Sequence, residues 1–244
     1  MGRDMTLGRR LAAEFVGTMM LLAAVVGSGI MAERLAGGSV GLALLANTLA
    51  TGAALTALIL TFGPISGAHL NPAVTLADAS QGGLSWGDAG AYVMVQVGGA
   101  LVGTGVADLM FGEPSFSWSQ HGRHGAAQLL SEFVATFGLL AVVWGCSRLR
   151  STVVVPFAVA AYITAAYWFT ASTSFANPAA TIARACSDTF AGIAPADVPG
   201  FIAAQLCGAA CATALFRWLV PALPATAQRV VARDLARVAT GRHP

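Results

Sequence analysis

The charged residues lie so far apart that they divide the chain into long apolar runs. Charge-free runs occupy residues 15–32, 35–77, 89–106, 133–147, 151–183 and 198–216. A helix of roughly 20 apolar residues crosses the hydrocarbon core of a bilayer. The repeated runs therefore predict an all-α integral membrane protein in which nearly every helix spans the bilayer.

Two of these runs are too long for one membrane crossing and too short for two crossings joined by a polar loop. Residues 35–77 contain the break Gly63-Pro64-Ile65-Ser66-Gly67, residues 151–183 contain Ala171-Ser172-Thr173-Ser174, and Asn-Pro-Ala follows each break. Asn favours the helix N-cap and Pro the first helical position. Each run therefore predicts a full span, a re-entrant loop and a half-helix that starts near the midplane, which gives six transmembrane helices plus two half-helices. Irregular backbone at that depth must be buried or line a water-filled cavity.

The chain also repeats itself. The segment around Glu14 recurs at Glu132, Asn71-Pro72-Ala73 recurs at Asn177-Pro178-Ala179, and Tyr92 through Gly99 recurs as Phe201 through Gly208. We predict one channel domain at 1–221, with repeat one at about 9–110 and repeat two at about 127–221, and a basic tail at 222–244. Three spans per repeat invert the second half, and broken helices in inverted halves mark a transport site.

Composition and charge support a membrane protein with both termini inside. Only 10 % of the residues are charged, against roughly 25 % in a soluble domain. All 13 basic residues are arginines, and six spans with a cytoplasmic N-terminus place ten of them inside and three, Arg34, Arg123 and Arg184, outside. This agrees with the positive-inside rule. We expect an uncleaved first helix and a cytoplasmic tail, which either lies on the inner leaflet as a basic amphipathic helix or is solvated.

The four cysteines show no metal-binding spacing, and we expect neither a metal nor a cofactor. Cys207 and Cys211 are four residues apart, on one face of an apolar helix, with Cys146 and Cys186 elsewhere. Small packing residues explain them best.

The two Asn-Pro-Ala motifs, the string from Ser66 to Thr75 and the pair Glu14 and Glu132 resemble the aquaporin (major intrinsic protein) superfamily over roughly residues 9–221. The resemblance implies the aquaporin fold and a homotetramer in the lipid bilayer, with one pore per protomer for small neutral solutes. It implies no part for nucleic acid.

In that family the motif residues Asn71, Pro72, Ala73, Asn177, Pro178 and Ala179 would line the pore midpoint. The two half-helix N-termini, each with roughly half a positive charge, would repel cations, and the Asn amides would orient single-file water and interrupt proton hopping. Two ordinary helix caps are the plainer interpretation.

For Glu14, Glu132 and His69, two roles each are consistent with the sequence. The resemblance implies that Glu14 and Glu132 accept hydrogen bonds from the re-entrant loops, while a carboxylate in mid-span could alternatively relay protons. His69 matches a pore-lining loop histidine, and either a gating or a purely structural role fits.

The selectivity filter is where the chain departs from the family pattern. The four filter positions fall on Thr51, Ala165, Ser174 and Ala180, without the usual Arg after the second motif. Two hydroxyls and two methyls predict a wide ring. Arg184, one helical turn beyond Ala180, either bonds to loop carbonyls or supplies the missing charge at the vestibule.

These features predict a passive channel, not an enzyme, in a bacterial inner membrane. The second motif resembles that of a bacterial subgroup associated with arsenic resistance, so trivalent arsenic as neutral arsenite is the favoured solute, with glycerol-like solutes and water. The alternatives are an orthodox water or glycerol channel, and a secondary transporter, for which no spare midplane carboxylate is evident.

Overall fold

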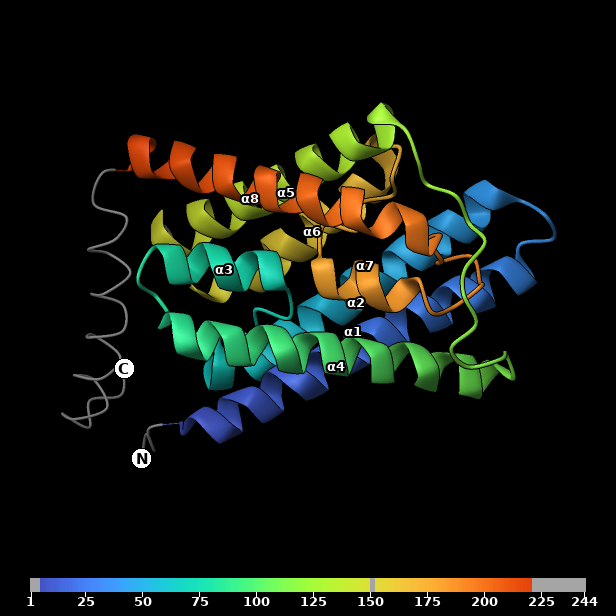
Figure 1. Cartoon of the computed structure of the whole chain (residues 1–244), viewed down its shortest axis with the longest axis horizontal. Helices are drawn as coiled ribbons and strands as arrows, with labels where there is room; N and C mark the ends of the chain where they lie inside the picture. Colours follow the sequence, from blue (N-terminus) through green and yellow to red (C-terminus); the bar gives the residue numbers. More distant parts are fainter. Residues whose placement is uncertain (1–4, 150–151, 221–244) are drawn as a thin grey trace.

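The computed structural model describes residues 5–149 and 152–220, so the predicted tail at 222–244 lies outside the described residues. Eight α-helices and two short 3₁₀ turns, η1 (Thr152–Val154) and η2 (Pro195–Asp197), account for most of this range (Figure 1). The helices are α1 (Leu7–Leu35), α2 (Val40–Ser66), α3 (Pro72–Ser80), α4 (Trp86–Phe111), α5 (Ala126–Leu149), α6 (Val155–Phe169), α7 (Pro178–Arg184) and α8 (Val198–Leu219).

The helices confirm the predicted all-α membrane fold, and the described residues contain no strand. Five of them, α1, α2, α4, α5 and α8, are long and apolar enough to cross a bilayer. The sixth, α6, has only 15 residues because Pro156 sits in its first turn, and η1 precedes it directly. The two short helices, α3 and α7, begin at the Asn-Pro-Ala motifs as predicted.

Each half of the chain packs around its own first helix, and the two halves then close on each other. Helix α1 packs along α4 and α2, α5 packs along α8 and α6, and α2 meets α6 across the middle. The half-helices α3 and α7 each contact both α4 and α8.

The start of α1 and the end of α8 lie at one end of the bundle, on the left in Figure 1, which we call the proximal end. Helix α3 runs toward this end and α7 toward the opposite, distal end. The two half-helices therefore point away from each other, with their N-termini at the centre of the bundle.

The re-entrant loops have matching left-handed backbone. Positive φ angles occur at Gly67, Ala68 and Leu70 in the first loop, and 106 residues later at Thr173, Ser174 and Ala176. Helix α2 continues through Pro64 and ends at Ser66, so the first break begins four residues later than the sequence predicted, at Gly67 with φ of 91°. Such conformations are costly for residues other than glycine, so both loops need support from their surroundings.

Two glycines let the long helices approach closely at equivalent points. A Cβ atom at Gly99 on α4 would collide with the Phe15 carbonyl oxygen on α1, and one at Gly208 on α8 would collide with the Phe133 carbonyl oxygen on α5. Small residues that bring backbones together are a common basis of helix packing in membranes.

We predict that Gly99→Ala lowers the free energy of unfolding by about 1–3 kcal/mol, the usual cost of overpacking a close contact. Gly90→Ala is the matched control on the same helix, because nothing lies within 4 Å of its Cβ position. Thermal unfolding of both purified variants in detergent measures the difference, and equal stability would contradict the close-contact explanation.

Candidate pore

The two motif asparagines cap their half-helices and cross-link the two re-entrant loops. Asn71 Oδ1 accepts a hydrogen bond from the Ala73 amide at 2.9 Å, and Asn177 Oδ1 accepts one from the Ala179 amide at 3.0 Å. Each side-chain amide donates across the midline, Asn71 to the Ala176 carbonyl at 2.7 Å and Asn177 to the Leu70 carbonyl at 2.8 Å. An amide group has two donors, so one N–H of each asparagine remains for a solute.

The Glu14 carboxylate fastens the first re-entrant loop to α1. One oxygen accepts hydrogen bonds from the Ser66 hydroxyl at 2.6 Å and the His69 backbone amide at 3.0 Å. The other accepts from the Leu70 backbone amide at 2.7 Å and the Gln96 side chain at 2.8 Å. All four partners donate, and charge-assisted hydrogen bonds are stronger than neutral ones.

The Glu132 carboxylate makes the same four bonds in the second half. Its first oxygen accepts from the Ser172 hydroxyl at 2.6 Å and the Phe175 amide at 2.9 Å. Its second accepts from the Ala176 amide at 2.9 Å and the Gln205 side chain at 2.6 Å. Because both carboxylates are fully buried and saturated with donors, this geometry favours loop support over proton relay.

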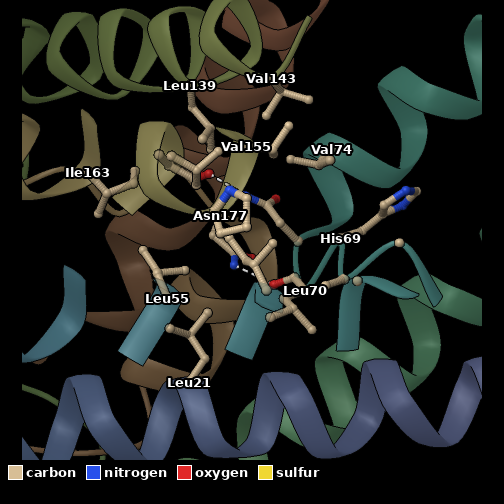
Figure 2. Close-up of a pocket in the computed structure, with 18 of the residues that line it drawn as sticks. Leu21, Leu55, His69, Leu70, Val74, Leu139, Val143, Val155, Ile163 and Asn177 are labelled. Atoms are coloured by element: carbon tan, nitrogen blue, oxygen red, sulfur yellow. Dashed lines mark hydrogen bonds between the residues drawn. The ribbon is translucent and has the colours of Figure 1, made fainter. Parts of the chain in front are cut away.

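A cavity of about 670 Å³ runs past both Asn-Pro-Ala motifs. Its middle is walled by apolar side chains, shown in Figure 2 around Asn177 and Leu70: Leu21 from α1, Leu55 from α2, Leu139 and Val143 from α5, and Val155 and Ile163 from α6. The cavity reaches Arg10, His69 and Asp78 at the proximal end and Arg184 at the distal end. Such a passage offers a solute few polar partners between its two mouths.

Three of the four predicted filter residues, Thr51, Ser174 and Ala180, line the distal part of this cavity. The Ser174 hydroxyl has no hydrogen-bond partner among the described residues.

The expectation for Ala165 is wrong, because this residue is exposed and does not line the cavity. Tyr167 lines it instead, with its hydroxyl 3.3 Å from the Thr51 hydroxyl. Two residues along an α-helix turn the side chain by roughly 200°, at 3.6 residues per turn, so a small error in counting back from Asn177 selects the opposite face. The sequence signal that could have found Tyr167 is a hydroxyl-bearing aromatic in an otherwise apolar run. Thr51, Tyr167, Ser174 and Ala180 therefore present three hydroxyl groups, one of them phenolic, and the methyl group of Ala180 to the cavity.

Arg184 is buried at the distal end of the cavity, with 3 % of its surface exposed. Its Nε donates to the Ala191 carbonyl oxygen, and its guanidinium carbon lies 3.4 Å from the centroid of the Phe175 ring. The two expectations for Arg184 are therefore compatible: it bonds to a loop carbonyl and it lines the cavity.

His69 lies at the proximal mouth. Its Nδ1 is 3.1 Å from the Thr75 hydroxyl and its Nε2 is 3.8 Å from a carboxylate oxygen of Asp78. Its ring centroid is 5.6 Å from that of Tyr92. The residue therefore lines the cavity and is held by partners on α3.

A membrane helix bundle with two half-helices, an inverted pair of buried carboxylates and a cavity through its centre defines a transmembrane channel. The chain matches the major intrinsic protein family over residues 2–153 and belongs to it. Members of this family are channels and not enzymes.

Curated relatives and a solved structure agree with this assignment. The chain is 54 % identical over 223 residues to aquaglyceroporin AqpS of Rhizobium meliloti (strain 1021), which covers 91 % of this chain and 95 % of that protein. It is 37 % identical over 150 residues to aquaporin NIP3-1 of Oryza sativa subsp. japonica, covering 57 % of this chain and 45 % of the relative. The X-ray structure of the aquaglyceroporin from Plasmodium falciparum superposes with a TM-score of 0.69 at 21 % identity, over 89 % of this chain and 99 % of that one, which supports the fold.

We predict that Glu14→Gln and Glu132→Gln each lower the free energy of unfolding by at least about 2 kcal/mol, since an amide leaves buried backbone donors without an acceptor. Solute flux falls together with stability. Glu33→Gln, at an exposed position on α1, is the control. Thermal unfolding and flux at several pH values measure both effects, and a change in pH dependence without a loss of stability would favour the proton relay.

Proposed function

We propose that this protein is a passive channel for small uncharged solutes, wider than an orthodox water channel, that conducts water, glycerol-like solutes and trivalent arsenic as undissociated arsenite. The observation that carries the proposal is one continuous cavity that joins both motif asparagines to a filter with Ala180 in the usual position of arginine. The relative at 54 % identity is an aquaglyceroporin, which agrees with the glycerol-like part of the proposal.

The midpoint of the pore selects against charge. Asn71 and Asn177 each offer one free N–H to a solute, next to a half-helix N-terminus that carries roughly half a positive charge. Two such termini at the centre of the bundle repel cations, and two donors orient a water file in opposite directions, so that proton hopping is interrupted. Glu14 and Glu132 serve this arrangement by holding the loops.

The filter selects by size and hydrogen bonding. Thr51, Tyr167 and Ser174 supply hydroxyls, and the methyl group of Ala180 leaves open the space that an arginine would fill. Arsenite is a neutral trihydroxy solute close to glycerol in size, and it can bond to these hydroxyls in the same way. Because the groups of the ring are neutral, no charged side chain has to lose its water when such a solute passes.

We place the proximal end in the cytoplasm of a bacterium and the protein in the inner membrane, as a homotetramer with one pore per protomer. Ten arginines then fall inside and three outside, as the positive-inside rule requires. The distal mouth with Arg184 faces outward.

Stopped-flow light scattering on proteoliposomes tests the proposal. We expect water, glycerol and arsenite to enter faster than in empty vesicles, with a low activation energy and without saturation. Saturable uptake driven by an ion gradient would instead establish a secondary transporter, and water flux alone would establish an orthodox water channel.

Ala180→Arg tests the filter. The added side chain narrows the ring and places a fixed charge beside it, so we predict that glycerol and arsenite fluxes fall by about tenfold or more, as for a barrier raised by 1.4 kcal/mol, while water flux remains. Ala180→Ser, which stays small and neutral, is the control, and unchanged arsenite flux in Ala180→Arg would overturn the filter assignment.

Arg184→Ala tests charge exclusion at the distal mouth. We predict that glycerol flux stays the same or rises, because a bulky side chain leaves the cavity, while a cation or proton leak appears under an imposed potential. A folded variant without any leak would assign exclusion to the half-helix termini and the two asparagines alone.

A further inference from the structure

Arg123 belongs to the loop between α4 and α5, yet its side chain reaches toward the second re-entrant loop. Its Nε donates to the Gly192 carbonyl at 2.8 Å, and one terminal nitrogen donates to the Ser172 carbonyl at 3.2 Å. Its guanidinium carbon lies 4.9 Å from the centroid of the Phe175 ring. The side chain therefore connects the α6–α7 loop to the α7–α8 loop. The sequence pattern placed Arg123 on the outer side but gave it no role.

The backbone that carries Arg123 is itself fixed. The Ser119 amide donates to the Ala185 carbonyl at 3.0 Å, and the Ala194 amide donates to the His121 carbonyl at 2.7 Å. The Arg123 amide donates to an Asp197 carboxylate oxygen at 2.6 Å. Three bonds between the α4–α5 loop and the α7–α8 segment determine the point from which the guanidinium extends.

Arg184 shares the Phe175 ring with Arg123 and bonds to the neighbouring residue of the same loop. Its Nε bonds to the carbonyl of Ala191, the neighbour of Gly192, and its guanidinium lies over the same Phe175 ring. Burial lowers the pKa of Arg123, and the negative charge of Glu132 counteracts part of this shift. An arginine remains charged in spite of such a shift, so two cations share one aromatic partner.

We propose that Arg123 is a positioning residue for the distal constriction: it fixes Phe175 and the 191–192 backbone, and thereby keeps Arg184 at the end of the cavity. The inference rests on the proposed channel function. Without Arg123, two loop carbonyls lose their donor and the Phe175 ring loses one cation. Arg184 then moves aside more readily, so that a bulkier neutral solute passes.

The experiment compares two polyols of different size in proteoliposomes. We expect Arg123→Ala to raise the ratio of erythritol to glycerol permeability by about threefold to fivefold, the change expected for the loss of one cation–π contact. The matched control is Arg34→Ala. Arg34 also bonds to a carbonyl, that of Phe111 at 2.7 Å, and lies over the ring of the same residue at 5.4 Å. Phe111 does not line the cavity, whereas Phe175, the ring under Arg123, does.

A double-mutant cycle with Arg184 separates positioning from general loosening. If Arg123 acts through Arg184, the effect of Arg123→Ala on the permeability ratio disappears in an Arg184→Ala background, since coupled residues are not additive. An equal rise in both backgrounds, or no rise in the wild-type background, overturns the proposal. Absence of glycerol flux through the wild-type protein overturns the proposed function instead.

Arg123→Lys completes the test and replaces Arg123→Ala if the latter fails to fold. Lysine keeps the charge but not the forked donor geometry of the guanidinium. We expect its permeability ratio to be raised as in Arg123→Ala, because an ammonium group does not reproduce the hydrogen bonds to Gly192 and Ser172 together with the contact to the Phe175 ring. A wild-type ratio in Arg123→Lys would mean that the forked geometry is not needed, and the positioning role would be wrong.

Discussion

The structure depends on two buried carboxylates that hold irregular backbone at the depth of the bilayer centre. Backbone amides at that depth have no water to bond to, and each amide without a hydrogen-bond partner destabilises the fold by several kcal/mol. Glu14 and Glu132 each accept four hydrogen bonds, two of them from backbone amides of a re-entrant loop. The left-handed residues in these loops persist because the carboxylates determine their geometry from outside. The position of the half-helices, the direction of the asparagine amides and the course of the cavity all follow from this support.

The two halves share this framework and differ at the mouths of the pore. The offset of 106 residues that relates Asn71 to Asn177 also relates His69 to Phe175 and Asp78 to Arg184. The proximal mouth therefore pairs an imidazole with a carboxylate at 3.8 Å, whereas the distal mouth pairs an aromatic ring with a guanidinium at 3.4 Å. One backbone framework thus carries different side chains at its two ends: Asp78 faces His69 at the proximal mouth, and Arg184 lies over Phe175 at the distal mouth.

The wall between the mouths explains why neutral solutes fit this pore best. Leucine, valine and isoleucine side chains from α1, α2, α5 and α6 line the middle of the cavity, and polar groups are concentrated at the asparagines and at the distal ring. An ion would lose its hydration without compensation along this wall. A small hydroxylated solute needs only a few hydrogen bonds, and the ring of Thr51, Tyr167 and Ser174 can supply them.

The sequence by itself determined the membrane class, the inverted repeat, the half-helices and the residues of both Asn-Pro-Ala motifs, because these follow from local rules: run length, N-cap and proline preferences, and a constant offset between repeats. It also singled out Glu14 and Glu132, since a mid-span carboxylate is rare. It placed the cavity-lining residue of α6 at Ala165 instead of Tyr167, because a count back from Asn177 crosses the loop between α6 and α7, and a shift of two residues selects the opposite face of the helix. It could not reveal Arg123, whose function arises only when three loops meet. Only the tertiary structure decides such contacts, since they join segments about 50 and 70 residues apart along the chain. A local sequence pattern does not indicate which distant carbonyl a side chain will bond to.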